Sequence, residues 1–351
     1  MWYGPIGYYR YKECDMSNAK GTKNAYKMSV ILSSERMSST GKRIVKILKK
    51  GTGSFHHLEV MCDVFANGEV KPWIPETVRG EHVFVLQDLQ EPNPNTALIQ
   101  LLLTIDALSR ASVEGITLVL PYLPYLRQDR KDRARSPISA RAVANFLQCY
   151  SKVERLITVD MHVDQEQGFS NIPVDNIRAY KVHAAYFKKE LGKAVKNVIV
   201  VSPDLGGGTR AKRFAQELGE DVPVGVIDKR RTGPNQIEVL SYNGPPLKGK
   251  VAIIYDDMID TGGTIRGTAA TIKKLGAREA YVCVTHGIFS RDAEVEFNKS
   301  MHPIVISSSI PRSKAYRKRH KKWLTVVSID EFLAEAIHQA SLVGGSVSKL
   351  S

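Results

Sequence analysis

The sequence predicts an α/β protein with two tandem domains, each built on a mainly parallel sheet with helices on its faces. Short apolar runs alternate with helix-length amphipathic segments, and this alternation occurs twice, with a joint near residues 173–180. The length of 351 residues suits two medium-sized domains with separate cores. We therefore expect a weakly ordered extension at 1–28, a first domain at 29–176 and a second domain at 177–351.

The elements are predicted from local pattern. Strands are expected where apolar and β-branched residues run together, and helices where apolar residues recur every three or four positions. In the first domain this gives strands at 29–32, 58–65, 82–86, 115–120 and 155–159, with helices at 41–50, 96–112 and 139–150. In the second domain it gives strands at 197–201, 224–227, 251–255, 280–285 and 304–307, with helices at 181–191, 208–218, 263–275 and 329–342.

The net charge of +14 is concentrated in two places. Residues 1–50 hold eleven Lys and Arg against three Asp and Glu, while Arg312–Lys322 holds seven Lys and Arg and no acid. The rest of the chain is therefore close to neutral. Neither basic segment has the aromatic interleaving of an RNP-type motif, which disfavours a nucleic-acid-binding module. Tyr and Trp residues do cluster in residues 1–12, so a secondary RNA or partner contact there stays open. We interpret Arg312–Lys322 as a solvated surface loop.

The spacing of the cysteines and the distribution of apolar residues indicate the compartment in which the protein is located. The four cysteines lie far apart and form no CxxC pair, which is typical of a reducing cytosol rather than of a disulfide framework or a zinc site. No segment reaches the ~18–20 apolar residues that a membrane span needs, and the first residues contain no continuous apolar run of the secretory type. We predict a cytoplasmic protein without a membrane partner.

The segment Val251–Ile265, VAIIYDDMIDTGGTI, carries the strongest chemical signal. An apolar strand ends in two carboxylates, and a Gly-containing turn then leads into a helix. Ligands of open α/β sheets bind at the carboxyl ends of strands, where glycines let backbone N–H groups approach a phosphate and the helix offers its positive end. Asp256 and Asp257 are poor phosphate ligands, because their negative charges repel a phosphate. They suit sugar hydroxyls or the ligand shell of a magnesium ion instead.

Four further segments point to one family: Leu120–Asn145 (LPYLPYLRQDRKDRARSPISARAVAN), Val159–Asn176 (VDMHVDQEQGFSNIPVDN), Val200–Gly207 (VVSPDLGG) and Thr285–Ser290 (THGIFS). The Asp-Asp segment resembles the phosphoribosyl-pyrophosphate (PRPP) signature shared by type I phosphoribosyltransferases and ribose-phosphate diphosphokinases. The other four resemble segments of the ribose-phosphate diphosphokinase (PRPP synthetase) family alone. The resemblance runs from about residue 30 to residue 348, and it implies two tandem type I phosphoribosyltransferase-like domains.

The resemblance implies an activity and a sugar-phosphate site. The family transfers the β,γ-diphosphoryl group of ATP to the 1-hydroxyl of ribose 5-phosphate, giving PRPP and AMP, with Mg²⁺ as cofactor. The implied ribose 5-phosphate residues are Asp256, Asp257, Asp260, Thr261, Gly262, Gly263 and Thr264. The implied diphosphate loop is Asp204, Leu205, Gly206 and Gly207, in which Leu205 replaces the usual Ala and could shift the loop. The implied metal ligands are His162 and Asp204.

The resemblance also implies the ATP site and the catalytic pair. ATP would be bound by Phe65, Asn67, Glu69, Arg127 and Gln128. Lys229 and Arg231, expected on a mobile loop, would stabilise charge on the transferring group. Read without the family, FANGE at 65–69 is an Asn-Gly turn and KRRTGPN at 229–235 is a charged hairpin.

The implied assembly is a homo-oligomer built from dimers, up to a hexamer of dimers. The family's phosphate and ADP regulatory site falls near Thr77, Arg79 and Arg135. Ala134 stands where many regulated members have Ser, and the lost hydroxyl costs ~1–2 kcal/mol of phosphate binding, so we expect weak or absent phosphate activation.

Two alternative functions are open. One is a non-catalytic regulatory subunit of the same fold, which the presence of His162, Asp204 and Lys229 disfavours. The other is a phosphoribosyltransferase that consumes PRPP, which the RQDRK and HVDQEQGF segments disfavour, because those segments belong to ATP and metal binding in the synthetases.

Overall fold

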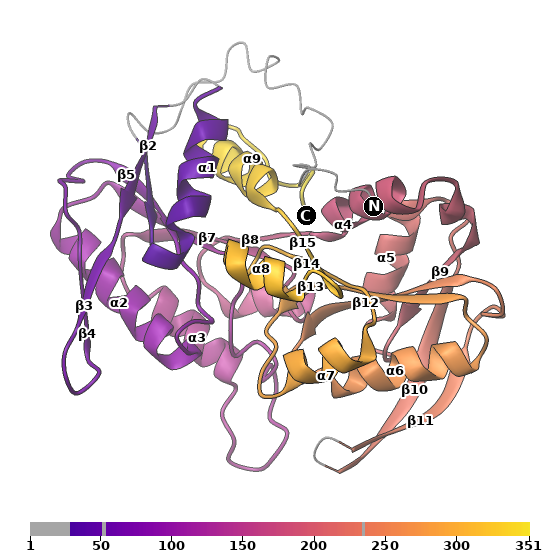
Figure 1. The fold of residues 1–351 in the computed structure, drawn as a ribbon. Helices are drawn as coiled ribbons and strands as arrows, with labels where there is room; N and C mark the ends of the chain where they lie inside the picture. The colour runs from indigo at the N-terminus through magenta and orange to yellow at the C-terminus, as the bar shows by residue number, and fades with distance from the viewer. Residues whose placement is uncertain (1–28, 51–53, 234–235) are drawn as a thin grey trace. The chain divides into compact units, whose positions relative to one another are not determined.

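The computed structural model describes residues 29–50, 54–233 and 236–351, so the predicted extension at 1–28 lies outside the described residues (Figure 1). The described chain forms two compact units. Among the described residues, the N-terminal unit comprises those from 29 to 178 together with 330–351, and the C-terminal unit comprises those from 179 to 329.

The N-terminal unit is built on a parallel sheet with strand order β2-β1-β5-β6-β7-β8. Its strands are β1 (Ser29–Ser33), β2 (Phe55–Glu59), β5 (His82–Leu86), β6 (Gly115–Leu120), β7 (Val153–Val159) and β8 (Val174–Ile177). Every residue of β1, β5 and β6 is buried, because helices cover both faces of a parallel sheet, and its central strands are therefore mostly apolar. A separate antiparallel hairpin joins β3 (Met61–Val64) to β4 (Val70–Trp73).

The helices of this unit are α1 (Ser38–Leu48), α2 (Pro94–Arg110), α3 (Ser139–Leu147) and α9 (Asp330–Ser341), with the short 3₁₀ helices η2 (Glu35–Met37) and η3 (Asp164–Phe169). The helix α9 packs against α1, and Arg43 of α1 forms an ion pair with Asp330. The amide of Arg178 donates to the carbonyl of Leu350 at 2.8 Å. The segment from residue 330 onward, which we had assigned to the second domain, therefore groups with the first, while the domain limits themselves stay a prediction.

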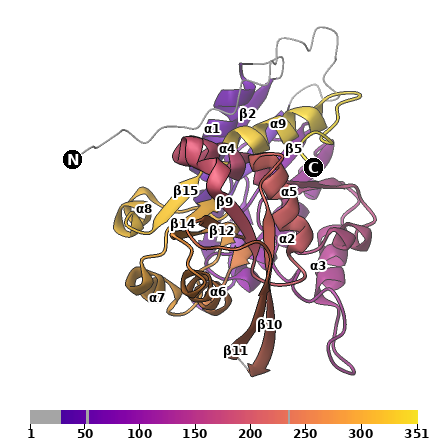
Figure 2. The same cartoon turned by 90° about the vertical axis from the view of Figure 1, so that its right-hand side faces the viewer.

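The C-terminal unit is built on a sheet with strand order β11-β10-β9-β12-β13-β14-β15. Its strands are β9 (Val198–Ser202), β10 (Val224–Gly233), β11 (Gln236–Asn243), β12 (Val251–Ile259), β13 (Glu279–Gly287), β14 (Ile304–Ser307) and β15 (Leu324–Val327). All neighbouring strands are parallel except β10 and β11, which form an antiparallel hairpin at one edge (Figure 2). The helices are α4 (Tyr180–Leu191), α5 (Gly208–Leu218), α6 (Gly263–Lys274), α7 (Ala293–Ser300) and α8 (Lys314–His320), and the 3₁₀ helix η4 (Gly192–Asn197) follows α4.

The structure confirms the α/β class with mainly parallel sheets and corrects several local predictions. The strand predicted at 58–65 is divided between β2 and β3, and the strand predicted at 224–227 continues to Gly233. The predicted surface loop Arg312–Lys322 contains the helix α8, because its aromatic residues pack inward at helical spacing. Among the described helices, none combines the length and the apolar character needed to cross a membrane.

Candidate active site

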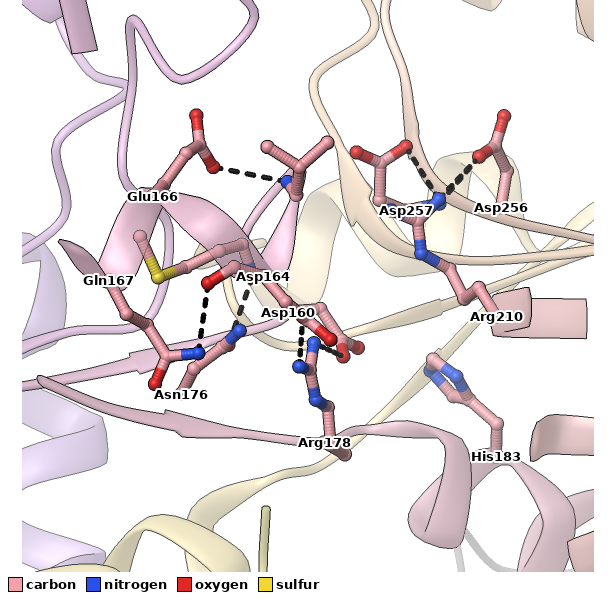
Figure 3. A network of polar contacts seen from close by, with 12 residues as sticks. Asp160, Asp164, Glu166, Gln167, Asn176, Arg178, His183, Arg210, Asp256 and Asp257 are labelled. Atoms are coloured by element: carbon pink, nitrogen blue, oxygen red, sulfur yellow. Dashed lines mark hydrogen bonds and ion pairs between the residues drawn. The ribbon is translucent and has the colours of Figure 1, made fainter. Parts of the chain in front are cut away.

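The end of β12 brings the predicted sugar-binding carboxylates against an arginine that the sequence analysis did not single out. Nη1 of Arg210 lies 2.9 Å from Oδ1 of Asp256 and 3.5 Å from Oδ1 of Asp257 (Figure 3). Arg210 stands in the first turn of α5, directly after the predicted diphosphate loop. One guanidinium therefore connects the two carboxylates to the helix that follows that loop.

Burial decides the electrostatics of this carboxylate pair. The side chain of Asp257 is only 4% exposed and that of Asp256 only 16%. Burial and then the neighbouring Asp257 charge raise the pKa of Asp256 well above its ordinary value, and the Arg210 guanidinium acts in the opposite direction. Arg210 thus offsets part of the repulsion between two carboxylates placed side by side at the strand end.

The turn Asp260–Thr264 joins β12 to α6, and its shape depends on Gly262. This glycine has φ +74°, a left-handed conformation, and a Cβ added to it would lie 2.5 Å from Cε2 of Phe297. Nη1 of Arg266 donates to the Thr261 carbonyl at 3.2 Å, and its guanidinium lies over the Phe297 ring. The turn then enters α6, whose first N–H groups form a ready anion site. This arrangement fits a phosphate at the turn.

The predicted diphosphate loop is a compact turn between β9 and α5. Oδ1 of Asp204 accepts from the Gly207 amide at 2.9 Å, and the Ser202 hydroxyl donates to the Asp204 carbonyl at 2.7 Å. A Cβ on Gly207 would lie 2.7 Å from the Ser202 hydroxyl, so a side chain there would have to displace that hydroxyl. Leu205 is 67% exposed, so its bulk projects outward and the turn closes beneath it.

The predicted catalytic pair lies on β10 rather than on a loop. The backbone of Lys229 pairs with Val239 and that of Arg231 with Ile237, and the register shifts between Asp228 and Lys229. The strand was predicted to end at 227 because the charged KRR run breaks the apolar pattern. Pairing with β11 continues the strand instead, so the charged-hairpin interpretation describes this backbone.

In the N-terminal unit, a polar network fixes the segment that carries His162. Arg178 pairs with Asp164 and lies 3.7 Å from Asp160, while the Met161 amide donates to Oδ1 of Asn176 at 3.0 Å (Figure 3). Oε2 of Glu166 accepts from the Val163 amide at 3.1 Å. His162 is therefore held on a braced turn after β7. No local motif marks Arg178 and Asn176, whose roles come from tertiary contacts.

The predicted ATP residues lie on two separate segments of the N-terminal unit. Phe65, Asn67 and Glu69 form the β3–β4 turn, in which the Phe65 amide donates to the Glu69 carbonyl at 2.8 Å. Phe65 is 53% exposed. Arg127 and Gln128 follow β6, and Oε1 of Gln128 accepts from the Ser139 hydroxyl at 2.5 Å.

The arrangement of the His, Cys, Asp and Glu side chains decides which kind of metal site is possible. Within the described residues, no three His, Cys, Asp or Glu side chains are gathered as a metal cage. Mg²⁺ is usually held by one or two carboxylates together with substrate phosphates, so a pre-formed cage is not needed. The carboxylates of Asp204, Asp256 and Asp257 supply oxygen donors of the required kind in the C-terminal unit.

The sheet, the carboxylate pair and the glycine turn define a phosphoribosyl-binding protein, and residues 174–330 match the phosphoribosyl transferase domain family. Residues 29–150 match the N-terminal domain of ribose phosphate pyrophosphokinase. The chain therefore belongs to the ribose-phosphate pyrophosphokinase family. The N-terminal match also separates it from phosphoribosyltransferases that consume PRPP.

Curated relatives and a solved structure agree with this assignment. The chain is 45% identical over 274 residues to the ribose-phosphate pyrophosphokinase of Fusobacterium nucleatum, covering 78% of this chain and 84% of that protein. It is 42% identical over 293 residues to the enzyme of Aquifex aeolicus, covering 83% and 90%. The phosphoribosylpyrophosphate synthetase of Mycobacterium smegmatis superposes with a TM-score of 0.77 at 35% identity, covering 89% and 98%.

Proposed function

We propose that this chain is a ribose-phosphate pyrophosphokinase that uses ATP and ribose 5-phosphate and releases PRPP and AMP. The observation that carries the proposal is the carboxylate pair of β12 followed by the Gly262 turn. This site lies inside the matched phosphoribosyl transferase domain, and the residues before that domain match the N-terminal domain of ribose phosphate pyrophosphokinase. In such transfers the protein mainly positions the reactants and stabilises charge.

The C-terminal unit would hold the acceptor. The turn Asp260–Thr264 and the start of α6 bind the 5-phosphate through backbone N–H groups. Asp256 and Asp257 accept hydrogen bonds from the ribose hydroxyls, and Arg210 positions the pair. The 1-hydroxyl oxygen then bonds to the β-phosphorus of ATP, the bond from that phosphorus to the oxygen bridging to the α-phosphorus breaks, AMP leaves, and the hydroxyl proton is released.

The donor would be recognised by the residues predicted for ATP. Phe65 stacks on adenine, Asn67 and Glu69 read its polar edge, and Arg127 with Gln128 contacts the rest of the nucleotide. Lys229 and Arg231 on β10 stabilise negative charge on the diphosphoryl group as it transfers.

Mg²⁺ is the proposed cofactor, and when bound it neutralises phosphate charge during the transfer. Asp204 is the proposed carboxylate ligand of the C-terminal unit and His162 the proposed ligand of the N-terminal unit. A homo-oligomer built from dimers and a cytoplasmic location complete the proposal, and light scattering of the purified protein measures the first.

The test is AMP release from ATP and Mg²⁺ with and without ribose 5-phosphate. We expect sugar-phosphate-dependent AMP formation with PRPP in equal amount. AMP that does not depend on ribose 5-phosphate, or no AMP at all, would reject the enzyme and favour the regulatory-subunit alternative.

Replacement of the proposed catalytic lysine sharpens this test. Lys229→Ala should lower kcat by about a thousandfold, because one preorganised cation at the transferring group is removed, while both substrates still bind. Lys274→Ala, on the exposed side of α6, is the matched control and should keep wild-type turnover. A Lys229→Ala turnover within tenfold of wild type would contradict the assignment.

A further inference from the structure

The basic run Arg312–Lys322 is organised by the helix α8 and the turn after it. Lys314, Arg317 and Lys318 lie at helical spacing on one side, and Lys321, whose backbone is still helical, follows one turn later. At 1.5 Å per residue this cationic stripe is about 10 Å long. All four side chains are exposed, as are Arg319 and Lys322 beside them.

Aromatic packing on the opposite side fixes the direction in which this stripe faces. The Tyr316 ring lies 4.5 Å from that of His320, which in turn lies 5.2 Å from Trp323. The Tyr316 hydroxyl donates to Oε1 of Glu294 at 2.5 Å, and Nε2 of His320 lies 3.4 Å from Oε2 of the same residue. The helix is therefore attached to the unit by its inner side, and its outer side is left to the cations.

The stripe lies apart from the candidate active site within the C-terminal unit. The helix α8 contacts β15, the edge strand of the sheet, whereas the carboxylate pair ends β12, three strands away (Figures 1 and 2). Phosphate binding by the substrates therefore does not account for these cations.

We propose that the cationic stripe of Lys314, Arg317, Lys318 and Lys321 is a docking surface for the phosphate backbone of a nucleic-acid duplex. Charge complementarity is the basis, since a duplex presents a regular row of phosphates that an exposed row of Lys and Arg neutralises with release of counterions. The sequence had argued against nucleic acid because the run lacks interleaved aromatic residues. Binding to the phosphate backbone of a duplex needs no interleaved aromatic residues. The helix also places these cations in one row, which an irregular loop would not do.

The composition of the outer side selects a duplex over other anionic partners. Single strands are bound through exposed aromatic rings on which bases stack, and the rings of α8 face inward. A membrane helix needs an exposed apolar side, and a protein interface needs an apolar centre. No large apolar side chain of residues 312–322 is exposed, so the surface offers charge and little else.

The test is fluorescence anisotropy of a labelled 20-base-pair DNA duplex titrated with the full chain over a range of salt concentrations. Four phosphate contacts predict a slope of log affinity against log salt of about −3.6. The triple variant Lys314→Gln, Arg317→Gln, Lys318→Gln should reduce the steepness of that slope by about three. Its AMP release should match the wild type, which shows that the protein is folded.

A matched triple variant distinguishes this surface from net charge. Lys188, Lys193 and Lys196 are exposed cations elsewhere on the C-terminal unit, and changing all three to Gln removes the same charge. This variant should keep the wild-type slope. The proposal is overturned if both triple variants lose duplex binding equally, or if neither loses it. It is also overturned if a single strand of the same length binds as tightly as the duplex, or if phosphatidylserine vesicles bind and the duplex does not.

Discussion

The carboxylates of Asp256 and Asp257 share the guanidinium of Arg210, at 2.9 and 3.5 Å from Nη1. Removing this cation takes a counter-charge away from two mostly buried carboxylates, and a lost charge-assisted hydrogen bond costs about 1.5–3 kcal/mol. We expect Arg210→Met to raise the KM for ribose 5-phosphate at least ~tenfold and to leave the KM for ATP nearly unchanged, in initial-rate assays that vary each substrate separately.

The conservative replacement at the same position tests whether Arg210 acts by charge. Arg210→Lys keeps the cation but loses the planar fork, so the KM for ribose 5-phosphate should lie between those of wild type and Arg210→Met. If the KM for ATP and that for ribose 5-phosphate rise together in both variants, Arg210 supports the fold rather than the carboxylate pair. Wild-type AMP release separates that outcome from failure of the proposed function.

His82 is a titratable residue enclosed in the N-terminal core. Its side chain is fully buried and its Nε2 lies 2.9 Å from the Thr117 hydroxyl. Burial, with a smaller contribution from Arg155, lowers the pKa of His82 to about 4. As pH falls, His82 is therefore protonated in the unfolded chain before it is protonated in the folded protein. The contribution of neutral His82 to the free energy of unfolding is fully present above about pH 6.5 and is lost between pH 6.5 and 4.

The expected size of this pH effect is about 3 kcal/mol in the free energy of unfolding, at 1.36 kcal/mol for each unit of pKa difference. His82→Gln keeps a polar partner for Thr117 and removes the titration. Denaturant unfolding at pH 7, 5.5 and 4.5 should show a smaller pH dependence in this variant than in wild type. Parallel curves for the two proteins would mean that another group carries the loss.

At the scale of elements, the connection from β12 to α6 depends on one glycine. An L-residue at the φ of +74° of Gly262 costs ~1–2 kcal/mol, and its Cβ would also collide with Phe297 at 2.5 Å. Gly262→Ala should therefore distort the turn Asp260–Thr264, the proposed 5-phosphate site, and raise the KM for ribose 5-phosphate roughly tenfold or more. Gly267→Ala, in the helix α6 that follows and with no atom besides its chain neighbours and the nearby backbone of that helix within 4 Å of the added Cβ, is the control and should leave that KM unchanged.

Elements were predictable from sequence where a single segment contains its own signal. Strands 82–86, 115–120 and 304–307 and helix 208–218 have the predicted bounds, because continuous apolar runs or a clear 3.6-residue period mark them. Short or mixed segments were not predicted. β8 has two polar residues in four, and the inward side of α8 and the turn after it consists of Tyr316, His320 and Trp323 rather than aliphatic residues. Because basic residues surround these aromatic residues in the sequence, their helical spacing is hard to recognise.

The same contrast holds in the candidate site. Asp256, Asp257 and the Gly262 turn are adjacent in sequence, so one motif predicts them together. Arg210 stands 46 positions before Asp256, and only the packing of α5 beside β12 brings it to the pair. Sequence pattern finds residues that are neighbours along the chain, whereas counter-charges and braces such as Arg178 come from tertiary contact.

At the scale of the whole molecule, the N-terminal unit is completed by the last segment of the chain. The helix α9 packs on α1, and its Phe332, Leu333 and Ile337 are buried. Arg43 and Asp330 pair between these two helices. Residues separated by nearly 300 positions therefore form one core, and the segment after 329 should unfold with residues 29–178 and independently of β12 and β13.

This grouping is testable by hydrogen exchange of the full chain followed by mass spectrometry. Ile337→Ala removes a fully buried side chain and should cost about 2–5 kcal/mol, because an aliphatic truncation leaves a cavity. Exchange should accelerate in peptides from β1 and α1 and stay at wild-type rates in peptides from β12 and β13. Val343→Ala, at a position that is 63% exposed, should change neither. Acceleration confined to β12 and β13 would instead assign α9 to the C-terminal unit, because the destabilised core would then be the one that contains those two strands.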